Sequence, residues 1–316
     1  MKAPPRPIAR ILLGMREAYS KGENAMEWCR NCFRRGNETE EGNDLLATLV
    51  AYDLQAGTYI SAARADREKN RLWCRQLADL LSSVIAEGDS ILEVGVGEAT
   101  TLAGVLLEIR AKLSLALGFD VSWSRASEGK KWLMENDCVA ELFVADLMNI
   151  PLADASVDVV YSSHSLEPNR GKEADAIREC LRVARKAVVL VEPIYELASR
   201  EAQARIRSHG YVEGLRETAA RLGAKVSDYR LLDYTPNPLN PSGVVHLTKV
   251  GASDGSKDQS IAIAWRCPIT AVALEAGAEF FYAREVGLAY PVLRGIPMLR
   301  AEHVIVASKL ESVVGE

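Results

Sequence analysis

Glu93, Gly95 and Gly97 are the residues whose types and spacing most clearly suggest chemistry. They end an apolar run and precede a segment, 102–111, that is compatible with a helix, so the order predicts a buried strand, a tight turn and a helix N-terminus. Because glycine has no Cβ, the backbone of the turn can approach a ligand closely. The free N–H groups of the helix start would then face that ligand. The carboxylate of Glu93 would repel a pyrophosphate and would favour a cationic or zwitterionic ligand.

A second acid, Asp120, follows a mostly apolar run that is consistent with another strand. It lies 23 positions after Gly97, which is close to the ~20-residue offset at which an acid meets a ribose in nucleotide-binding βαβ units. The ribose of an adenosine offers two vicinal hydroxyl donors, and one carboxylate can accept from both. We therefore expect Asp120 to bind a ribose. An exposed acid in a loop is the alternative.

Two other interpretations of the glycine turn compete with this one. The first is a strand, a turn and a helix that bind nothing. The second is a dinucleotide fingerprint, G-x-G-x-x-G, whose third glycine allows close packing of the helix on the strand. Thr100 occupies that third position, so the residues disfavour a dinucleotide.

The pattern Glu93-x-Gly95-x-Gly97 resembles motif I of the class I S-adenosylmethionine (SAM) methyltransferases, in particular those of ubiquinone and menaquinone biosynthesis. The resemblance implies that these residues hold the methionine end of SAM, largely through water. It also implies that a third acid, Asp146, accepts from the adenine amino group, while the backbone N–H of Leu147 donates to adenine N1. A helix cap is the other interpretation of Asp146. The expected cofactor is SAM, and the expected product is S-adenosylhomocysteine (SAH).

Two more segments carry the resemblance. Residues 52–59 read Tyr-Asp-x-x-Ala-x-x-Tyr, which resembles a segment upstream of motif I in many of these enzymes. This places Tyr59 near the cofactor, although packing of one helix on another is an equal alternative. A fourth strand, 157–163, ends at Ser163, and in the resembling fold this strand end faces both cofactor and substrate.

His164 follows that strand and is a candidate general base, because imidazole can accept a proton near neutral pH. The competing interpretation is a wall of the pocket or a side chain that packs on SAM. Many methyl transfers from a sulfonium need no strong base. Positioning of the reacting atoms ~3–3.5 Å apart can supply much of the rate.

Three residues further along are candidates for the substrate pocket. Tyr195 lies just past a fifth strand, although an aromatic that packs between helices is the alternative. Asn237 and Asn240 lie in a loop that three prolines keep rigid. If the runs on either side form an antiparallel pair, this loop lies over the active site and its amides could bind a polar substrate. A structural hairpin turn is equally compatible with the sequence.

The elements that would position these residues alternate between strand and helix, which is typical of an α/β fold. We expect a Rossmann-like class I methyltransferase sheet of seven strands, with an N-terminal helical cap over residues 1–85 and the SAM-binding domain over 86–250. The expected strands are 90–94, 113–117, 142–147, 157–163, 187–193, 225–234 and 244–250. The expected helices after the cap are 102–111, 122–136, 174–184, 194–207 and 215–222.

A change of composition after a polar stretch, 251–259, predicts a linker and a further module over 260–316. Cys267-Pro268, Tyr290-Pro291 and Gly295-Ile296-Pro297 resemble the signature of a small activator domain first known from tRNA methylation. Free activator proteins of this family cover apolar surface on a methyltransferase. The resemblance thus implies a small α+β module that packs on the catalytic domain in cis. The module has only Cys267, so we expect no zinc and no other metal.

The totals exclude several classes of protein. The chain has 316 residues, a net charge of −5 and a pI near 5.6, so no global basic field attracts nucleic acid. Six cysteines form no framework of close pairs, and the lone pair Cys29 and Cys32 lacks the second pair of a zinc ribbon. We expect a cytoplasmic protein with no membrane segment and no signal peptide.

The sequence therefore predicts a SAM-dependent methyltransferase that acts on an O or N nucleophile of a small polar metabolite or biosynthetic intermediate. One alternative is an RNA or translation-related protein methyltransferase, which is what free activators accompany. The other is a degenerate SAM-binding scaffold. No Asn-Pro-Pro-Tyr motif follows the fourth strand, which argues against the amino-methylating DNA and glutamine enzymes. The oligomeric state stays open, a homo-oligomer included.

Overall fold

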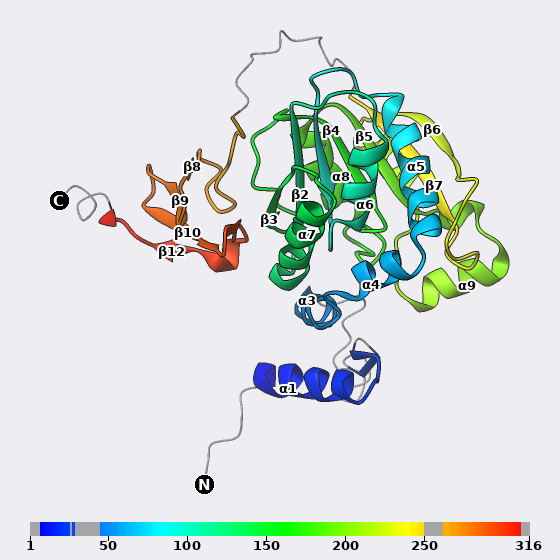
Figure 1. Cartoon of the computed structure of the whole chain (residues 1–316), viewed down its shortest axis with the longest axis horizontal. Coiled ribbons are helices and arrows are strands. Elements are labelled where there is room, and N and C mark those ends of the chain that lie inside the picture. Colours follow the sequence, from blue (N-terminus) through cyan, green and yellow to red (C-terminus); the bar gives the residue numbers. More distant parts are fainter. Residues whose placement is uncertain (1–6, 26, 29–44, 250–261, 311–316) are drawn as a thin grey trace.

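The computed structural model describes residues 7–25, 27–28, 45–249 and 262–310 (Figure 1). The predicted linker at 251–259 and the pair Cys29 and Cys32 lie outside these residues. Among the helices that are described, none combines the length and the apolar character needed to cross a membrane.

The centre of the molecule is a seven-stranded sheet with the strand order β3-β2-β1-β4-β5-β7-β6. Strands β1 to β5 are parallel, and β7 runs antiparallel to both β5 and β6. This confirms the predicted α/β class and the antiparallel pair that closes the sheet. The strands are β1 (Ser90–Val94), β2 (Leu115–Asp120), β3 (Glu141–Val144), β4 (Val157–Ser163), β5 (Ala184–Pro193), β6 (Lys225–Leu231) and β7 (Ser242–Thr248).

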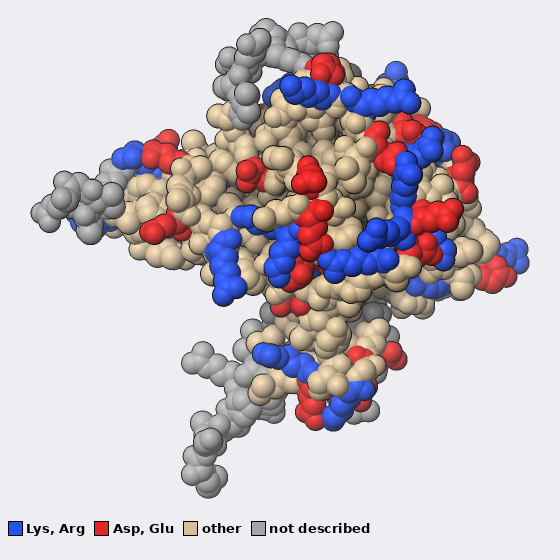
Figure 2. Space-filling view, in the orientation of Figure 1, with Lys and Arg blue, Asp and Glu red and all other residues tan. Residues whose placement is uncertain are grey.

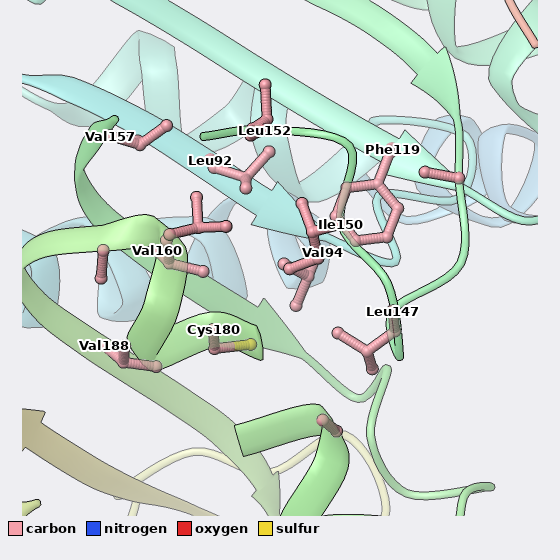
Figure 3. Close-up of a cluster of buried hydrophobic side chains, with 14 of the residues drawn as sticks. Leu92, Val94, Phe119, Leu147, Ile150, Leu152, Val157, Val160, Cys180 and Val188 are labelled. Carbon is pink, nitrogen blue, oxygen red and sulfur yellow. The ribbon is translucent and has the colours of Figure 1, made fainter. Parts of the chain in front are cut away.

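Helices cover both faces of the sheet, so its central strands are apolar on both sides. Successive side chains of a strand point to opposite faces, and Ile91 and Leu92 accordingly belong to two different buried clusters. Leu92 shares its cluster with Val160, Val188 and Cys180, whose side chains Figure 3 shows in one interior. The covering helices are α5 (Arg67–Ser82), α6 (Thr100–Glu108), α7 (Trp123–Glu135), α8 (Glu173–Val183), α9 (Arg200–Ser208) and α10 (Leu215–Arg221).

The single helix predicted over 194–207 is divided in the structure. A short 3-10 helix, η1 (Tyr195–Leu197), ends at Ala198, which is extended. Ser199 then caps α9, because its side-chain oxygen accepts from the backbone N–H of Ala202. Serine stabilises a helix start in this way and competes with helix continuation. Ser199 therefore begins a separate helix, α9, inside the segment that was predicted to be one helix.

The N-terminal helices are α1 (Pro7–Ser20), α3 (Leu45–Leu54) and α4 (Thr58–Ala65). Helices α1 and α3 pack on each other around Met15 and Ala51. Helix α3 is attached to the catalytic part through Asp53, which accepts from the hydroxyl of Ser122 (2.7 Å) and the backbone N–H of Ser124 (3.3 Å) at the start of α7. Helix α3 is therefore held at the start of α7, and α1 lies on the far side of α3 (Figure 1).

The C-terminal residues form a second, antiparallel sheet of five short strands, with the order β11-β10-β9-β8 and β12 paired to β10. This sheet lies beside the β3 edge of the central sheet (Figure 1). Its elements are β8 (Glu275–Ala276), β9 (Phe280–Ala283), β10 (Leu288–Leu293), β11 (Ile296–Pro297), the 3-10 helix η2 (Ala301–His303) and β12 (Ile305–Val306).

The C-terminal sheet packs directly on the catalytic part. Met298 makes a parallel bridge with Val144 of β3, and the backbone N–H of Leu299 donates to the carbonyl of Val144 (2.8 Å). Trp265 lies between Phe143 and Phe281, with a ring separation of 5.1 Å on each side. An uncovered edge strand presents unpaired N–H and C=O groups that promote aggregation. The C-terminal sheet satisfies part of this edge.

Replacing Trp265 by phenylalanine is expected to lower the free energy of unfolding by about 1 kcal/mol, because one edge-to-face contact and some buried area are lost. The loss should appear in a single unfolding transition, since Trp265 belongs to one core with residues of the central sheet. Urea unfolding followed by circular dichroism measures both. Phe280→Leu, in the same module but away from β3, is the comparison. A separate early transition of the module in the wild type would contradict the shared core.

Candidate cofactor and substrate site

A cavity of about 610 Å³ opens at the carboxyl ends of β1, β2 and β4. Its walls come from α3, α4 and α5 on one side and from the loop 234–240 on the other. The carboxyl ends of parallel strands are where α/β sheets bind ligands. Nine of the residues predicted to form the site line this cavity: Tyr59, Gly95, Asp120, Asp146, Leu147, Ser163, His164, Asn237 and Asn240.

The glycine turn depends on the absence of side chains. Gly95 and Gly97 have φ values of 66° and 55°, in the left-handed region that L-residues with a Cβ rarely adopt. A Cβ on Gly95 would lie 2.2 Å from the Cβ of Ser165, and a Cβ on Gly97 would lie 2.4 Å from Nη2 of Arg125. Gly97 does not itself line the cavity, so its first role is to shape the turn.

Asp120 connects the end of β2 to the glycine turn. Its Oδ2 accepts from the backbone N–H of Gly97 (3.0 Å), and its Oδ1 accepts from the backbone N–H of Ser122 (2.9 Å). The residue is buried but borders the cavity. Each carboxylate oxygen has a second lone pair, so both oxygens can still accept from a ligand while they hold the turn.

Asp146 and Leu147 lie just after β3. The Oδ1 of Asp146 accepts from the backbone N–H of Met148 (2.9 Å), which is the local bond of an Asx turn. The residues after it form a turn and not a helix, so the predicted alternative of a helix cap does not apply. The carboxylate and the following residue both border the cavity next to β2.

Glu93 lies behind the turn and does not line the cavity. It is 2% exposed, and its Oε2 accepts from the hydroxyl of Tyr161 (2.9 Å). Burial raises the pKa of Glu93 to about 8, although the hydrogen bond from Tyr161 acts to lower it. The carboxyl group is therefore largely protonated at neutral pH, and a cation that approached the turn would favour its ionised form.

Glu93→Gln is expected to reduce the loss of stability that the protein shows as pH rises. In wild type the folded state holds a proton on Glu93 between the unfolded pKa, near 4.5, and the folded pKa of about 8. The folded state binds more protons than the unfolded state there, so stability falls as pH increases through this range. Glutamine cannot ionise. Between pH 5.5 and 7.5, the variant should retain about 2 to 3 kcal/mol that wild type loses.

Urea unfolding at the two pH values measures this difference. Glu192 contributes a residual slope in both proteins, because burial raises its pKa to about 7. Glu285→Gln, in the exposed turn between β9 and β10, should leave the slope unchanged. An equally steep loss in Glu93→Gln would show that Glu93 is not the group that titrates.

Arg125 is a cavity residue that the sequence did not reveal. Its guanidinium is stacked with the rings of Tyr59 (4.6 Å) and Tyr52 (5.1 Å), from α4 and α3. It lies 3.8 Å from the carboxylate of Asp120 and 4.0 Å from that of Glu98. Burial acts to lower the pKa of Arg125, but these carboxylates and tyrosines outweigh it and the pKa is raised. Its position in the predicted helix 122–136 gave no signal, since an arginine there usually faces solvent.

Glu98 belongs to the same group of side chains. It is fully buried, and its Oε2 accepts from the backbone N–H of Ile60 (2.8 Å) in the first turn of α4. An acid at a helix start satisfies a free N–H and interacts favourably with the helix dipole. The glycine turn is therefore bonded to the helix that carries Tyr59.

His164 lines the cavity with both ring nitrogens engaged. Nδ1 lies 2.9 Å from a carboxylate oxygen of Glu167, and Nε2 lies 2.7 Å from the hydroxyl of Ser242. Burial acts to lower the pKa of His164, but the hydrogen bond and the charge of Glu167 outweigh it, so the pKa is raised. To take a proton from a substrate, the ring would have to release one of these partners. Its role as a general base stays a prediction.

Glu192 and Glu167 are two further acids that sequence analysis missed. Glu192, near the end of β5, is fully buried and accepts from the backbone N–H groups of Ser165, Leu166 and Glu167. It therefore fixes the loop that follows β4. Glu167 extends from this loop into the cavity. The strand-terminal position of Glu192 was visible in the sequence, but its hydrogen bonds join segments about 26 residues apart and could not be inferred from a local pattern.

The three predicted substrate residues differ in position. Asn240 is 8% exposed, and its Nδ2 donates to Oε2 of Glu167 (3.1 Å). Asn237 is exposed and mainly builds the loop, because its Oδ1 accepts from the backbone N–H of Leu239 (3.0 Å). Tyr195 lies outside the cavity, and its ring stacks with the guanidinium of Arg207 (4.6 Å). The structure thus favours the packing alternative for Tyr195, since the division of the predicted helix places it on η1.

Known proteins resemble the chain mainly in its fold. A SAM-dependent methyltransferase from Aquifex aeolicus aligns with 54% of this chain and 88% of its own, at 16% identity and a TM-score of 0.41. A chain of the complex between the Haloferax volcanii Trm112 methyltransferase activator and a methyltransferase aligns with 60% of this chain and 94% of its own, at 17% identity and a TM-score of 0.46. Geranyl diphosphate C-methyltransferase from Streptomyces coelicolor aligns with 55% of this chain and 80% of its own, at 12% identity and a TM-score of 0.43. Likeness of this degree says nothing about substrate or partner. No curated protein matches the chain in sequence.

A family model supplies the assignment. Residues 91–187, from β1 into β5, match the family described as "Methyltransferase domain". This segment contains the glycine turn and the cavity acids Asp120 and Asp146, and its strands belong to the seven-stranded sheet. The chain therefore carries a class I SAM-dependent methyltransferase domain, and the cofactor of that domain is SAM.

Proposed function

We propose that the protein transfers the methyl group of SAM to an oxygen or nitrogen nucleophile of a small polar metabolite or biosynthetic intermediate. The observation that supports this most directly is one cavity at the strand ends. It brings six of the predicted cofactor residues together with side chains that could bind a polar substrate, namely His164, Glu167, Asn169 and Asn240. SAM supplies an electrophilic methyl group on a sulfonium. The side chains of this cavity bind both partners and orient them for in-line transfer.

In the cofactor half, Asp120 would accept from the two ribose hydroxyls, and Asp146 with the backbone N–H of Leu147 would bind the adenine. Gly95 supports this arrangement, because a Cβ there would collide with Ser165 at the floor of the cavity. Glu93 and Gly97, which do not line the cavity, would help to hold the methionine end of SAM through water and through the shape of the turn. Ser163 and Tyr59 border the same space and would contact SAM there.

The substrate half lies between α5 and the loop 234–240. It is lined by the amides of Asn169 and Asn240, by Glu167 and His164, and by the ring of Trp73, which meets His164 edge-on at 5.6 Å. A pocket of this kind, closed over by helices, suits a small polar molecule. On the face that Figure 2 shows, lysine and arginine side chains are interspersed with aspartate and glutamate, whereas a nucleic-acid site requires clustered basic residues.

We also propose the finer assignments that the sequence suggested. The division into a cap at 1–85, a catalytic domain at 86–250 and a module at 260–316 agrees with the separate sheets. The resemblance to ubiquinone-biosynthesis enzymes and to the activator domain is part of the same proposal, as is a cytoplasmic location. A covalently attached activator-like module acts at a high effective concentration. Its contact with β3 is consistent with that role.

The activator resemblance is also what favours a second candidate, an RNA or translation-related protein methyltransferase. Retention of the full chain on RNA at low salt, lost as salt rises, would support that candidate. A scaffold that binds SAM without transferring its methyl group is the third candidate.

Calorimetry with SAM and with SAH tests the premise that all three candidates share, which is SAM binding. No binding at about 1 mM of either ligand would refute the proposal. Methyl transfer from labelled SAM to a metabolite extract then separates the enzyme from the scaffold.

A further inference from the structure

A corner of the substrate half has two hydrogen-bond acceptors that no donor in the described part of the chain satisfies. It is formed by Glu167, in the loop after β4, and by Asn240, in the loop before β7. Both line the cavity. The inference drawn from this corner rests on the proposed function, because it concerns the molecule that would receive the methyl group.

The orientation of the Asn240 amide is fixed by its neighbour. An ionised carboxylate can only accept hydrogen bonds, so the nitrogen Nδ2 must face Oε2 of Glu167, at 3.1 Å. The amide oxygen Oδ1 then points elsewhere, and it has no hydrogen-bond partner among the described residues although the residue is only 8% exposed. A buried acceptor left without a donor costs about 1–3 kcal/mol. Native proteins rarely retain such groups unless a ligand or an ordered water satisfies them.

Glu167 presents the second acceptor. Its Oε2 accepts from Nδ1 of His164 and from Nδ2 of Asn240. Within the described part of the chain, its Oε1 makes no hydrogen bond, and the side chain is 12% exposed. The three backbone N–H bonds to Glu192 hold the loop that carries it. The carboxylate is therefore positioned before any ligand arrives.

Apart from the acids assigned to the cofactor, Glu167 is the carboxylate of the cavity that pairs with no lysine or arginine of the described residues. Lys69 is paired with Asp66 at 2.9 Å. Arg125 lies beside Asp120, whose oxygens also accept from the glycine turn. The nitrogens of His164 and the Nδ2 of Asn240 are turned toward protein partners, so Glu167 and Asn240 present acceptors to a ligand.

We propose that this corner binds the amine group of the methyl-accepting substrate. One hydroxyl has a single proton to donate and could satisfy only one of the two acceptors, whereas an ammonium group has three. The carboxylate also favours a positive charge. The rings of Trp73 and Tyr52, which line the same cavity, add favourable cation–π surface.

The test compares amines with alcohols of the same shape on the full chain loaded with SAH. The probes are benzylamine against benzyl alcohol, and 2-phenylethylamine against 2-phenylethanol, with binding followed by calorimetry or ligand-observed NMR. We expect each amine to bind wild type at least about tenfold more tightly than its alcohol. In Glu167→Gln and in Asn240→Ala this preference should fall to about threefold or less. Glu285→Gln, far from the cavity, should keep it.

Several outcomes would overturn the inference: equal binding of amine and alcohol, binding of neither at about 10 mM, or a preference that survives in both cavity variants. Weaker SAH binding by Glu167→Gln would assign the corner to the cofactor's own amino group instead, which also overturns it. The melting temperature of each variant shows whether it is folded. If Glu167→Gln does not fold, Asn240→Ala still tests whether the amine preference depends on this corner. If wild type fails to bind SAH at all, the proposed function fails first, and the two failures are thus distinguishable.

Discussion

Gly95→Ala is expected to weaken the binding of SAM by at least about 100-fold, or ~2.7 kcal/mol. Two effects act together. The backbone at Gly95 has a φ of 66°, which costs a residue with a Cβ about 1 kcal/mol. The new methyl group would also lie 2.2 Å from the Cβ of Ser165, and a Cβ cannot rotate away as the end of a long side chain can. The turn or the loop after β4 must therefore move, and both border the cavity.

A matched control separates the two effects. Gly210 has nearly the same φ, 65°, and an added Cβ there meets nothing within 4 Å. Gly210→Ala should therefore show only the backbone cost, as a small loss of stability with SAM affinity unchanged. Calorimetry with SAM and thermal unfolding of both variants give the comparison. Equal SAM affinity in Gly95→Ala and wild type would show that the turn is not where the cofactor binds.

Asp120→Ala is expected to weaken the binding of SAM by more than about tenfold, or ~1.4 kcal/mol. The variant loses the acceptors that we propose for the ribose. It also frees the backbone N–H groups of Gly97 and Ser122, which Asp120 now binds. Hydrogen bonds to a charged group contribute about 1.5–3 kcal/mol each when their partner is removed. Calorimetry with SAH, which lacks the sulfonium charge, should show a similar loss.

Asp120→Asn is the informative comparison for this residue. The asparagine keeps one acceptor oxygen and the shape of the side chain, but it removes the negative charge 3.8 Å from Arg125. We expect its affinity for SAM to lie between those of wild type and Asp120→Ala. An unchanged affinity in the alanine variant would remove Asp120 from the ribose site and leave it a structural role in the turn.

The parts of the site that the sequence predicted are those encoded by short, local patterns. The glycine turn after β1 and the acids Asp120 and Asp146 each follow a recognisable strand, and parallel strands end at a common edge. Once the strands were identified, their shared location followed. The seven-stranded sheet was predictable for the same reason, because a doubly covered sheet requires continuous apolar strands.

The parts that were missed depend on contacts between distant segments. Arg125 reaches the cavity because two tyrosines from the cap stack on it, and nothing near it in sequence indicates this. Glu167 matters because Glu192 and Asn240, 25 and 73 positions away, position it. The break before α9 was missed for a different reason. The residues around Ser199 have a helical pattern, and this pattern hid the preference of the serine for the first position of a helix.

The bond between Glu98 and the backbone N–H of Ile60 has a consequence for the order of events during turnover. Because the carboxylate of Glu98 joins the glycine turn to α4, any movement of the turn when SAM binds would be passed on to the helix that carries Tyr59. The position of α4 would then be fixed by SAM before the methyl-accepting substrate binds. We expect sequential kinetics in which SAM enters first and SAH departs last.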